Sequence, residues 1–332
     1  MARRSSSRLV RWTVLVATVF VLLSVVFILA PHYAWAWSVR QHAVVGLWQS
    51  VKFPFFAQER DSHCTLMDAL SHTTPPHLRT SFVEAQQAVR PIRSEGNLEQ
   101  VDTPAGTFWI PKGEQVALAE ELEEQQSDEY GNGLRGIHPG DIVLDCGANV
   151  GTYTRRAVRA GASRVVAIEP APWALECLRR NLSAEIAKGS VVVYPKGVWD
   201  HDDKLELTVG PGGATSAATL VLGEGGKPRF ATVVPLTTID ELVAELHLPR
   251  VDFIKMDIEG AEPNALRGAV RTVAQFHPRL AISLEHRKTD PDAIPALTRT
   301  LWPEYRTTCG PCSNMNGHLQ PTMMFGAIPA AR

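Results

Sequence analysis

Two groups of residues in this sequence have types and spacing that can do chemistry. The first lies in "VLDCGANVGTYT", residues 143–154, where an apolar run ends at Asp145 and continues past Gly147 and Gly151. Glycines between a strand pattern and a helix pattern are typical of a turn that holds a nucleotide-like ligand. Glu169 follows about 20 residues later, where an acid commonly accepts hydrogen bonds from ribose hydroxyls. A bound nucleoside is therefore expected at this turn.

The loop itself indicates what else that nucleoside carries. Asn149 stands where a dinucleotide-binding motif has its second glycine, which disfavours NAD. The carboxylate of Asp145 would repel a pyrophosphate but would pair with an ammonium group. A nucleoside that bears an amino acid, such as S-adenosylmethionine, therefore fits both ends. Two structural alternatives stay open, because Asp145 can cap the next helix and Glu169 can be a solvated strand end.

The second group follows two later strand patterns. Lys255, Asp257 and Glu259 alternate along the end of "VDFIKMDIEG", and Glu285 and His286 end "RLAISLEH". The carboxyl ends of parallel strands meet at one edge of a sheet, so these side chains are expected to converge. We expect Asp257 and Glu285, with His286 nearby, to be the catalytic residues that orient and deprotonate an acceptor hydroxyl.

Three other roles stay open for these residues. The two acids can hold a divalent ion that lowers the pKa of the hydroxyl, but oxygen ligands alone do not establish a metal, so no metal site is assigned. Asp257 and Glu259 can instead satisfy backbone donors at the turn before a helix that Pro263 helps to start. Lys255 can be buried in a structural pair with one of these acids.

These side chains need a parallel sheet to bring them together, and the chain from Gly140 onward has the pattern of one. Near-continuous apolar strands alternate with amphipathic helices, which is typical of a parallel sheet covered on both faces. The expected strands are "DIVLDCG", "RVVAIEP", "VVVYPKGVWD", "VDFIKMDIEG" and "RLAISLEH". The expected helices span residues 150–160, 172–187, 238–246 and 262–273.

The same segments resemble a known family. The blocks "VLDCGANVGTYT", "VVAIEPAPWALECLRRNL", "KGVWD", "TTIDEL" and "VDFIKMDIEGAEPNALRGA" are similar to those of the FkbM family of S-adenosylmethionine-dependent methyltransferases. The resemblance runs from about Val101 to the end of the chain. It implies an α/β class I methyltransferase (Rossmann-like) fold, in which helices cover both faces of a mainly parallel seven-stranded sheet with one antiparallel strand near an edge. Strands near "EYRTTC" and "TMMFGAIP" would complete that sheet.

The resemblance also implies an activity and a set of cofactor-binding residues. Members of the family usually transfer a methyl group to an oxygen of a sugar or a related hydroxyl. The loop looks like the one that passes under the methionine portion of the cofactor, where glycine lets the backbone approach the ligand. Glu169 matches the ribose acid, and the turn after the third strand is similar to the place that contacts adenine. The implied cofactor-binding residues are Asp145, Gly147, Ala148, Asn149, Gly151, Glu169, Gly197 and Val198.

Composition limits the number of domains and the kinds of partner. The chain has 332 residues, of which 45% are hydrophobic, so after the tails are removed it fits a single large α/β domain. Its 33 basic residues nearly balance 35 acidic ones, which disfavours nucleic acid and favours a small-molecule or glycan partner. Five cysteines do not amount to a disulfide framework, and the close pair Cys309 and Cys312 is expected to be free thiols or a local disulfide.

The first segment predicts a membrane anchor. Residues 12–30, "WTVLVATVFVLLSVVFILA", form an uncharged apolar run long enough to span a bilayer as a helix. Four arginines precede it within residues 1–11 and only Arg40 follows closely, which predicts a cytoplasmic amino terminus and a domain on the far side. A cleaved signal peptide is the alternative, since "AWA" at residues 34–36 fits a cleavage site. S-Adenosylmethionine is made in the cytosol. Either the cofactor is imported into the far compartment, or the predicted topology is wrong.

The expected organisation along the chain has four parts. They are a cytoplasmic basic tail at 1–11, a transmembrane signal anchor at 12–30, a stalk at 31–95 and the methyltransferase domain at 96–332. "LEQVDTPAGTFWIPKG" predicts a hairpin that leads into the domain, and residues 114–129 predict a half-exposed helix whose acids are solvated. The glycine-rich residues 209–230 fit either a flap over the acceptor or a passive surface insertion.

The sequence therefore predicts a membrane-anchored, S-adenosylmethionine-dependent methyltransferase that modifies a hydroxyl of a sugar, a glycan or a related small molecule. An NAD-dependent oxidoreductase and a catalytically silent methyltransferase-like binding module are the alternatives. Binding of S-adenosylmethionine rather than NAD distinguishes the methyltransferase from the oxidoreductase. Formation of a methylated product distinguishes it from the silent binding module.

Overall fold

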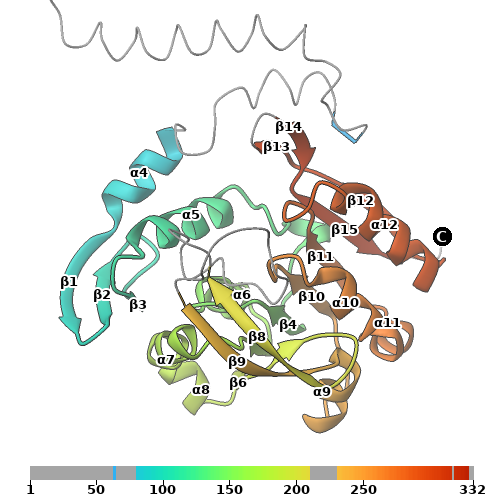
Figure 1. Ribbon diagram of the computed structural model, residues 1–332, viewed down its shortest axis with the longest axis horizontal. Coiled ribbons are helices and arrows are strands. Elements are labelled where there is room, and N and C mark those ends of the chain that lie inside the picture. Colours follow the sequence, from blue (N-terminus) through green and yellow to red (C-terminus); the bar gives the residue numbers. More distant parts are fainter. Residues whose placement is uncertain (1–62, 65–79, 210–229, 316–317, 329–332) are drawn as a thin grey trace, which may run out of the picture. The chain divides into compact units, whose positions relative to one another are not determined.

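The computed structural model describes residues 63–64, 80–209, 230–315 and 318–328, which are coloured in Figure 1. The predicted tail, the predicted anchor, most of the predicted stalk and the glycine-rich residues 210–229 lie outside these ranges, so the predictions for them stay untested. Within the described ranges, no helix combines the length and the apolar character that crossing a bilayer requires.

Seven strands form the main sheet of the domain. They are β4 (Ile142–Cys146), β5 (Arg164–Ile168), β6 (Val191–Tyr194), β10 (Phe253–Met256), β11 (Arg279–Ser283), β12 (Arg306–Cys309) and β15 (Met323–Ala327). Their order is β12-β15-β11-β10-β4-β5-β6. Neighbouring strands run parallel except β15, which is antiparallel to both β11 and β12. This confirms the mainly parallel sheet with one antiparallel strand near an edge, as in class I methyltransferases, and both carboxyl-terminal strands that the resemblance implied.

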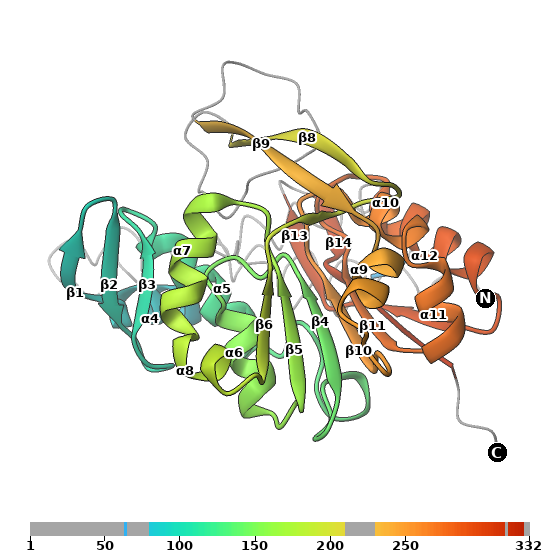
Figure 2. The same ribbon diagram turned by 90° about the horizontal axis from the view of Figure 1, so that it is seen from below.

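Helices cover both faces of this sheet. They are α6 (Thr152–Arg159), α7 (Pro172–Asn181), α8 (Ser183–Ala187), α9 (Ile239–Glu245), α10 (Glu262–Arg267), α11 (Val270–Phe276) and α12 (Asp290–Leu301). Successive residues of β4 point to opposite faces, so Val143 and Leu144, both fully buried, belong to two different cores. The core of Val143 includes residues of α6 and α7, and the core of Leu144 includes residues of α9 to α12. Figure 2 shows the first group of helices in green and the second in orange.

Local sequence explains where these helices begin and end. Pro172 and Pro263 stand in the first turns of α7 and α10, where the missing N–H leaves no helical hydrogen bond unmade. The helix predicted at 262–273 divides at Gly268, where a Cβ would lie 2.0 Å from the carbonyl oxygen of Trp199. The helix predicted at 172–187 divides at Leu182 into α7 and α8. The helices predicted at 150–160 and 238–246 are confirmed as α6 and α9, whereas α12 was not predicted.

A smaller sheet and two helices precede the main sheet along the chain. The elements are α4 (Thr80–Ala88), β1 (Arg90–Glu95), β2 (Leu98–Asp102), β3 (Phe108–Pro111) and α5 (Gln115–Gln126), followed by the short 3-10 helix η3 (Gly133–Arg135). Antiparallel pairing of β2 with β3 confirms the predicted hairpin, and pairing of β1 with β2 starts ordered structure before residue 96. The side-chain amide of Asn181 in α7 accepts from the N–H of Trp109 and donates to its carbonyl oxygen. These two bonds fix the small sheet to the main domain.

Two further strand groups lie outside the main sheet, and of their strands only β7 falls within a predicted strand, "VVVYPKGVWD". β7 (Gly197–Val198), β8 (Asp203–Val209) and β9 (Phe230–Thr237) form a three-stranded sheet in the order β7-β9-β8. β13 (Cys312–Met315) and β14 (His318–Pro321) form an antiparallel pair. β8 and β9 border the glycine-rich residues 210–229, and β13 and β14 have only four residues each, so the sequence gives little periodicity that marks these strands.

The cysteine prediction requires a correction. Cys312 forms a disulfide with Cys64, 248 residues earlier in the chain, with an S–S distance of 2.00 Å. Cys309 forms no disulfide with any residue in the described ranges. Cys309 ends β12 and pairs in register with Met324, whereas Cys312 begins the separate β13–β14 pair, so the two neighbours in sequence belong to different sheets. The CGPC segment is therefore neither a pair of free thiols nor a local disulfide.

Candidate functional site

A cavity of about 290 Å³ lies at the carboxyl ends of β4, β5, β10 and β11. Residues from both predicted groups line it, so the structure brings the two groups together at one edge of the sheet. Those residues are Gly147, Ala148, Asn149, Glu169, Gly197, Val198, Asp257 and Glu285. Asp145, Gly151 and His286 are not among the lining residues.

Two glycines of the loop after β4 are needed for packing. Gly147 has a φ of +80°, and a Cβ there would lie 1.9 Å from the carbonyl oxygen of Asp257. Glycine is therefore required here because the backbone at Asp257 packs against it, whereas the expected reason was the approach of a ligand. Gly151 has a φ of +92°, and a Cβ there would lie 2.7 Å from Leu178 of α7. The predicted contact of Gly151 with a cofactor stays a prediction, whereas its close packing against Leu178 is a structural reason for the glycine.

Asp145 is fully buried beneath the loop. Its carboxylate lies 3.5 Å from Nζ of Lys255 and accepts a hydrogen bond of 2.5 Å from the hydroxyl of Thr154. Lys255 also donates to the carbonyl oxygen of Gly147 at 2.9 Å. Asp145 is still part of β4, so its side chain lies on a face of the sheet. There it pairs with Lys255, whereas the sequence had suggested that it would pair with the ammonium group of a ligand. We interpret the pair as the support that positions the loop.

Glu169 lies at the end of β5 and is only 7% exposed. Its two carboxylate oxygens accept hydrogen bonds from the backbone N–H groups of Asn149, at 2.9 Å, and Ala171, at 2.8 Å. Burial raises the pKa of Glu169 to about 7, although these backbone donors lower it. Each carboxylate oxygen has a second lone pair, so the side chain can hold the loop and still accept from a ligand hydroxyl.

Helix α5 brings two acids to the cavity that the sequence did not reveal. Glu121 accepts hydrogen bonds from the hydroxyl of Thr152, at 2.7 Å, and from the side-chain amide of Asn149. Burial raises the pKa of Glu121 to about 7. Glu124 also lines the cavity, and burial together with nearby carboxylates raises its pKa well above the usual value. The prediction of solvated acids is therefore wrong for these two residues.

A periodic signal for these acids was present in the sequence. Ala117 is buried, and Glu121 and Glu124 follow it at spacings of about one and two helical turns, on the same face. Leu118 and Leu122 are buried as well, whereas Val116 is 45% exposed. The face that α5 turns inward therefore extends from the two leucines to Ala117, and it carries the two acids with it.

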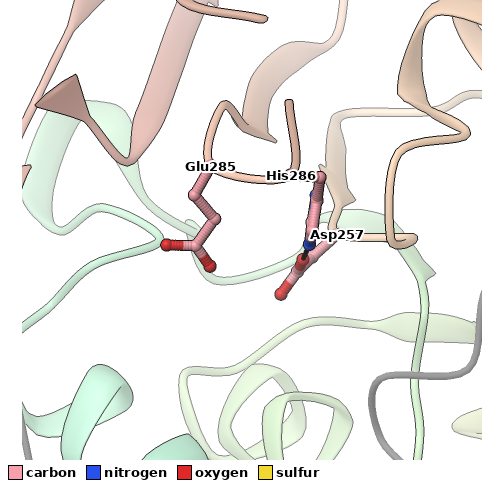
Figure 3. Close-up of side chains that lie close together, drawn as sticks. All are labelled: Asp257, Glu285 and His286. Carbon is pink, nitrogen blue, oxygen red and sulfur yellow. Dashed lines mark ion pairs between the residues drawn. The ribbon is translucent and has the colours of Figure 1, made fainter. Parts of the chain in front are cut away.

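The predicted catalytic residues Asp257, Glu285 and His286 lie close together (Figure 3), and Asp257 and Glu285 line the cavity. The hydroxyl of Tyr130 donates a hydrogen bond of 2.7 Å to Oδ2 of Asp257. Nε2 of His286 lies 3.4 Å from Oδ1 of Asp257, and its Nδ1 lies 3.1 Å from Oε1 of the fully buried Glu262. Neither Tyr130 nor Glu262 was identified in the sequence, because nothing in the local pattern of either marks it as a partner of these groups.

Charges in this cluster hold its members in different protonation states. Burial would raise the pKa of Asp257, but Lys255, His286 and the hydrogen bond from Tyr130 hold it below its usual value. Burial, with the neighbouring charge of Asp257, raises the pKa of Glu285 to about 8. Burial would lower the pKa of His286, but the carboxylates around it raise it to about 10. Asp257 is thus ionised near neutral pH, and His286 is positively charged.

Acidic groups predominate in this cavity. Lys255 is the only basic residue among the described residues that line it, and it is already paired with Asp145 and the loop carbonyl. A cavity in which carboxylates outnumber basic groups attracts positive charge, because a cation relieves the mutual repulsion of the carboxylates. The site therefore suits a cationic ligand better than a phosphate.

Comparison with protein families decides which kind of domain holds this site. Residues 145–307 match the model described as "Methyltransferase FkbM domain". The chain contains an FkbM methyltransferase domain. The matched range begins at the buried Asp145 and ends within β12, so it covers every predicted catalytic and cofactor-binding residue.

Individual relatives of this FkbM domain differ in how much of their length they share with it. Hexuronic acid methyltransferase AglP of Haloferax volcanii is 25% identical over 186 residues, which are 56% of this chain and 68% of AglP. Methyltransferase 1 of Beauveria bassiana is 29% identical over 146 residues, 38% of this chain and 57% of the relative. AMB antimetabolite synthetase AmbE of Pseudomonas aeruginosa is 28% identical over 168 residues, but the match spans only 8% of its length.

Among solved structures, the methyltransferase FkbM of Methylobacillus flagellatus aligns with a TM-score of 0.44 and 19% identity. The alignment covers 74% of this chain and 58% of that one. The roles of individual residues in the present chain stay predictions.

Proposed function

We propose that this chain is an S-adenosylmethionine-dependent methyltransferase that methylates a hydroxyl of a sugar, a glycan or a related small molecule. One observation carries the proposal: the loop and Glu169 share a single acidic cavity with Asp257 and Glu285. A cofactor side and an acceptor side thus meet at one edge of the sheet. The similarity to a hexuronic acid methyltransferase supports a sugar as the acceptor.

The residues of the cofactor side fit S-adenosylmethionine. Glu169 has free lone pairs for ribose hydroxyls, and Gly197 and Val198 line the cavity where adenine is expected. The surplus of carboxylates suits a ligand with a sulfonium and an ammonium group. When bound, S-adenosylmethionine supplies a methyl group, which joins the acceptor oxygen as the carbon–sulfur bond breaks and its electron pair stays on sulfur.

The residues of the acceptor side fit a hydroxyl that must lose its proton. Asp257 is held by Tyr130 at one oxygen, which leaves the other oxygen to accept a hydrogen bond from an acceptor hydroxyl. Glu285 lines the same cavity from the next strand. We assign these two acids to orienting the hydroxyl and taking its proton, and His286 to holding Asp257 in place.

The test uses the full-length protein in detergent and S-adenosylmethionine labelled in its methyl group. A panel of sugars and glycans serves as acceptors, and the expected result is a labelled methyl ether. Cofactor binding without any product would favour the silent binding module. Binding of NAD in place of S-adenosylmethionine would favour an oxidoreductase, and label on nitrogen or carbon would contradict methylation of oxygen.

We further propose that residues 12–30 anchor the chain in a membrane and that the domain faces the non-cytoplasmic side. The uncharged apolar run and the four arginines before it support this topology. The disulfide between Cys64 and Cys312 supports it independently, because disulfides persist mainly in oxidising compartments. Cofactor on that side of the membrane would have to be imported from the cytosol.

Protease protection tests this topology. In sealed vesicles with their cytoplasmic face outward, added protease should leave the domain intact until detergent is added. Alkylation without reductant should label Cys309 and spare Cys64 and Cys312, which reductant then exposes. Digestion of the domain in intact vesicles, or labelling of all three thiols without reductant, would contradict the proposal.

A further inference from the structure

Three potential metal ligands gather at the acceptor side of the cavity. Asp257 follows β10, and Glu285 and His286 follow β11. Figure 3 shows the three side chains close together. One ligand atom of each residue lies within 4.8 Å of the other two. Adjacent strand ends therefore place two carboxylates and one imidazole around a single point.

The imidazole of His286 is oriented by a carboxylate outside this group. Its Nδ1 lies 3.1 Å from Oε1 of Glu262, which is fully buried and also accepts a hydrogen bond from the N–H of Ile258. Its Nε2 therefore faces the cluster, 3.4 Å from Oδ1 of Asp257 and 3.5 Å from Oε2 of Glu259. Histidines that bind metals commonly place their second ring nitrogen against a carboxylate, which fixes the tautomer and the ring orientation.

The two carboxylates also have oxygens available. Tyr130 occupies Oδ2 of Asp257, so Oδ1 is left facing His286. Glu285 makes no hydrogen bond or ion pair with any residue in the part of the chain that the structure describes, and it lines the cavity. Each of the three side chains thus offers one donor atom toward the others, and further contacts hold Asp257 and His286 in place.

We infer that Asp257, Glu285 and His286 bind a divalent metal ion, with Glu262 and Tyr130 as positioning residues. The ion would take the place of the proton on Nε2 of His286, which leaves to solvent. Carboxylate oxygens suit Mn²⁺ and Mg²⁺, and an imidazole suits transition metals, so Mn²⁺ satisfies the whole set. The inference rests on the proposed function and deepens it. A metal here would bind the acceptor hydroxyl and lower its pKa, so that its proton leaves to a carboxylate or to water before the oxygen takes the methyl group.

The test is Mn²⁺ binding to the full-length protein in detergent, followed by the electron paramagnetic resonance signal of free Mn²⁺. This readout needs neither an acceptor nor turnover. One ion per chain is expected, and Asp257→Asn or His286→Ala should weaken binding at least about 10-fold. Glu262→Gln should weaken it by about 10- to 100-fold although it touches no ion, because it releases the imidazole.

His201→Ala is the matched control. His201 also lies beside two carboxylates, those of Asp200 and Asp203, but its side chain is 61% exposed and no buried acid orients it. Its substitution should leave Mn²⁺ affinity unchanged. Thermal unfolding checks that each variant is folded, and Glu285→Gln, which keeps the shape of the side chain, serves as a second ligand variant.

Absence of Mn²⁺ binding, or equal affinity in the wild-type protein and the folded ligand variants, would overturn the inference. An equal loss in His201→Ala would also overturn it, because it would show adventitious surface binding. Binding of S-adenosylhomocysteine, measured on the same samples, tests the proposed function separately, since none of these residues is assigned to the cofactor.

Discussion

The cofactor side and the acceptor side of the cavity are held in place by different kinds of contact. On the cofactor side, backbone N–H groups donate to both oxygens of Glu169, and Lys255 donates to a carbonyl of the loop. On the acceptor side, side chains hold side chains, as Tyr130 holds Asp257 and Glu262 faces His286. The backbone therefore positions the cofactor side, whereas contacts between side chains from distant parts of the sequence position the acceptor side.

This difference suggests a division of tasks. Contacts to the backbone change little with substitution, which suits a site for a ligand that is the same in every reaction. Contacts between side chains that follow α5, β10 and β11 or begin α10 can change with the sequence, which suits the part of a site that selects its acceptor. Substitutions on the acceptor side should therefore change turnover, whereas those on the cofactor side should change stability and cofactor affinity.

The largest effect is expected from Asp257→Ala. Loss of the carboxylate that binds the hydroxyl should lower methyl transfer by about 10²- to 10⁴-fold and leave affinity for S-adenosylhomocysteine measurable. Asp252→Asn is the control, because Asp252 lies at the opposite end of the same strand and bonds to the N–H of Ile142. Unchanged turnover in both Asp257→Ala and Glu285→Ala would remove the proposed distinction between the two sides.

Lys255→Met is expected to destabilise the fold. It leaves Asp145 fully buried without a cation, which should lower the free energy of unfolding by about 3–5 kcal/mol. Adding Asp145→Asn to Lys255→Met should restore most of that loss, because the uncompensated charge is gone. Chemical denaturation of the single and double variants measures both effects. A double variant no more stable than the single one would show that Lys255 acts through another contact.

Gly147→Ala tests whether packing shapes the loop. Its Cβ would collide with the carbonyl oxygen of Asp257, 1.9 Å away, so the loss of stability should exceed that of Gly140→Ala by about 1–3 kcal/mol. Gly140 has a comparable φ of +92° but nothing within 4 Å of the added atom, which makes it a matched control for backbone strain. Equal losses of unfolding free energy in the two variants would show that conformation alone requires the glycine.

The smallest expected effect is the contribution of Glu121 to the pH dependence of the free energy of unfolding. Its pKa is about 7 in the folded protein against an ordinary value near 4.5, so the native state favours the protonated form. Raising the pH from about 4.5 to 7 therefore costs stability, and the full penalty, about 1–3 kcal/mol, persists above pH 7.

The variant Glu121→Gln removes this group from the titration. Between pH 5.5 and 8 it should lose less unfolding free energy than the wild-type protein, whatever its stability at any single pH. Denaturation curves at both pH values measure the difference. Parallel pH profiles would mean that Glu121 is not protonated more readily in the folded state than in the unfolded state.

The sequence predicted the cofactor side better than the acceptor side, because local patterns report the path of the chain but not contacts between distant residues. The loop and Glu169 belong to one strand, one turn and the next strand, so periodicity and spacing were enough to place them. Glu121 depends on which face α5 turns inward, and Glu262 and Tyr130 act only through partners that folding brings near. The disulfide of Cys64 with Cys312 joins residues 248 positions apart, which no local pattern reports.

Calorimetry on the full-length protein tests the central claim most directly. The account predicts that both S-adenosylmethionine and S-adenosylhomocysteine bind once per chain, that NAD gives no heat, and that Glu169→Ala weakens binding by about 10- to 100-fold. The absence of heat with both the sulfonium compound and its demethylated product would contradict the account.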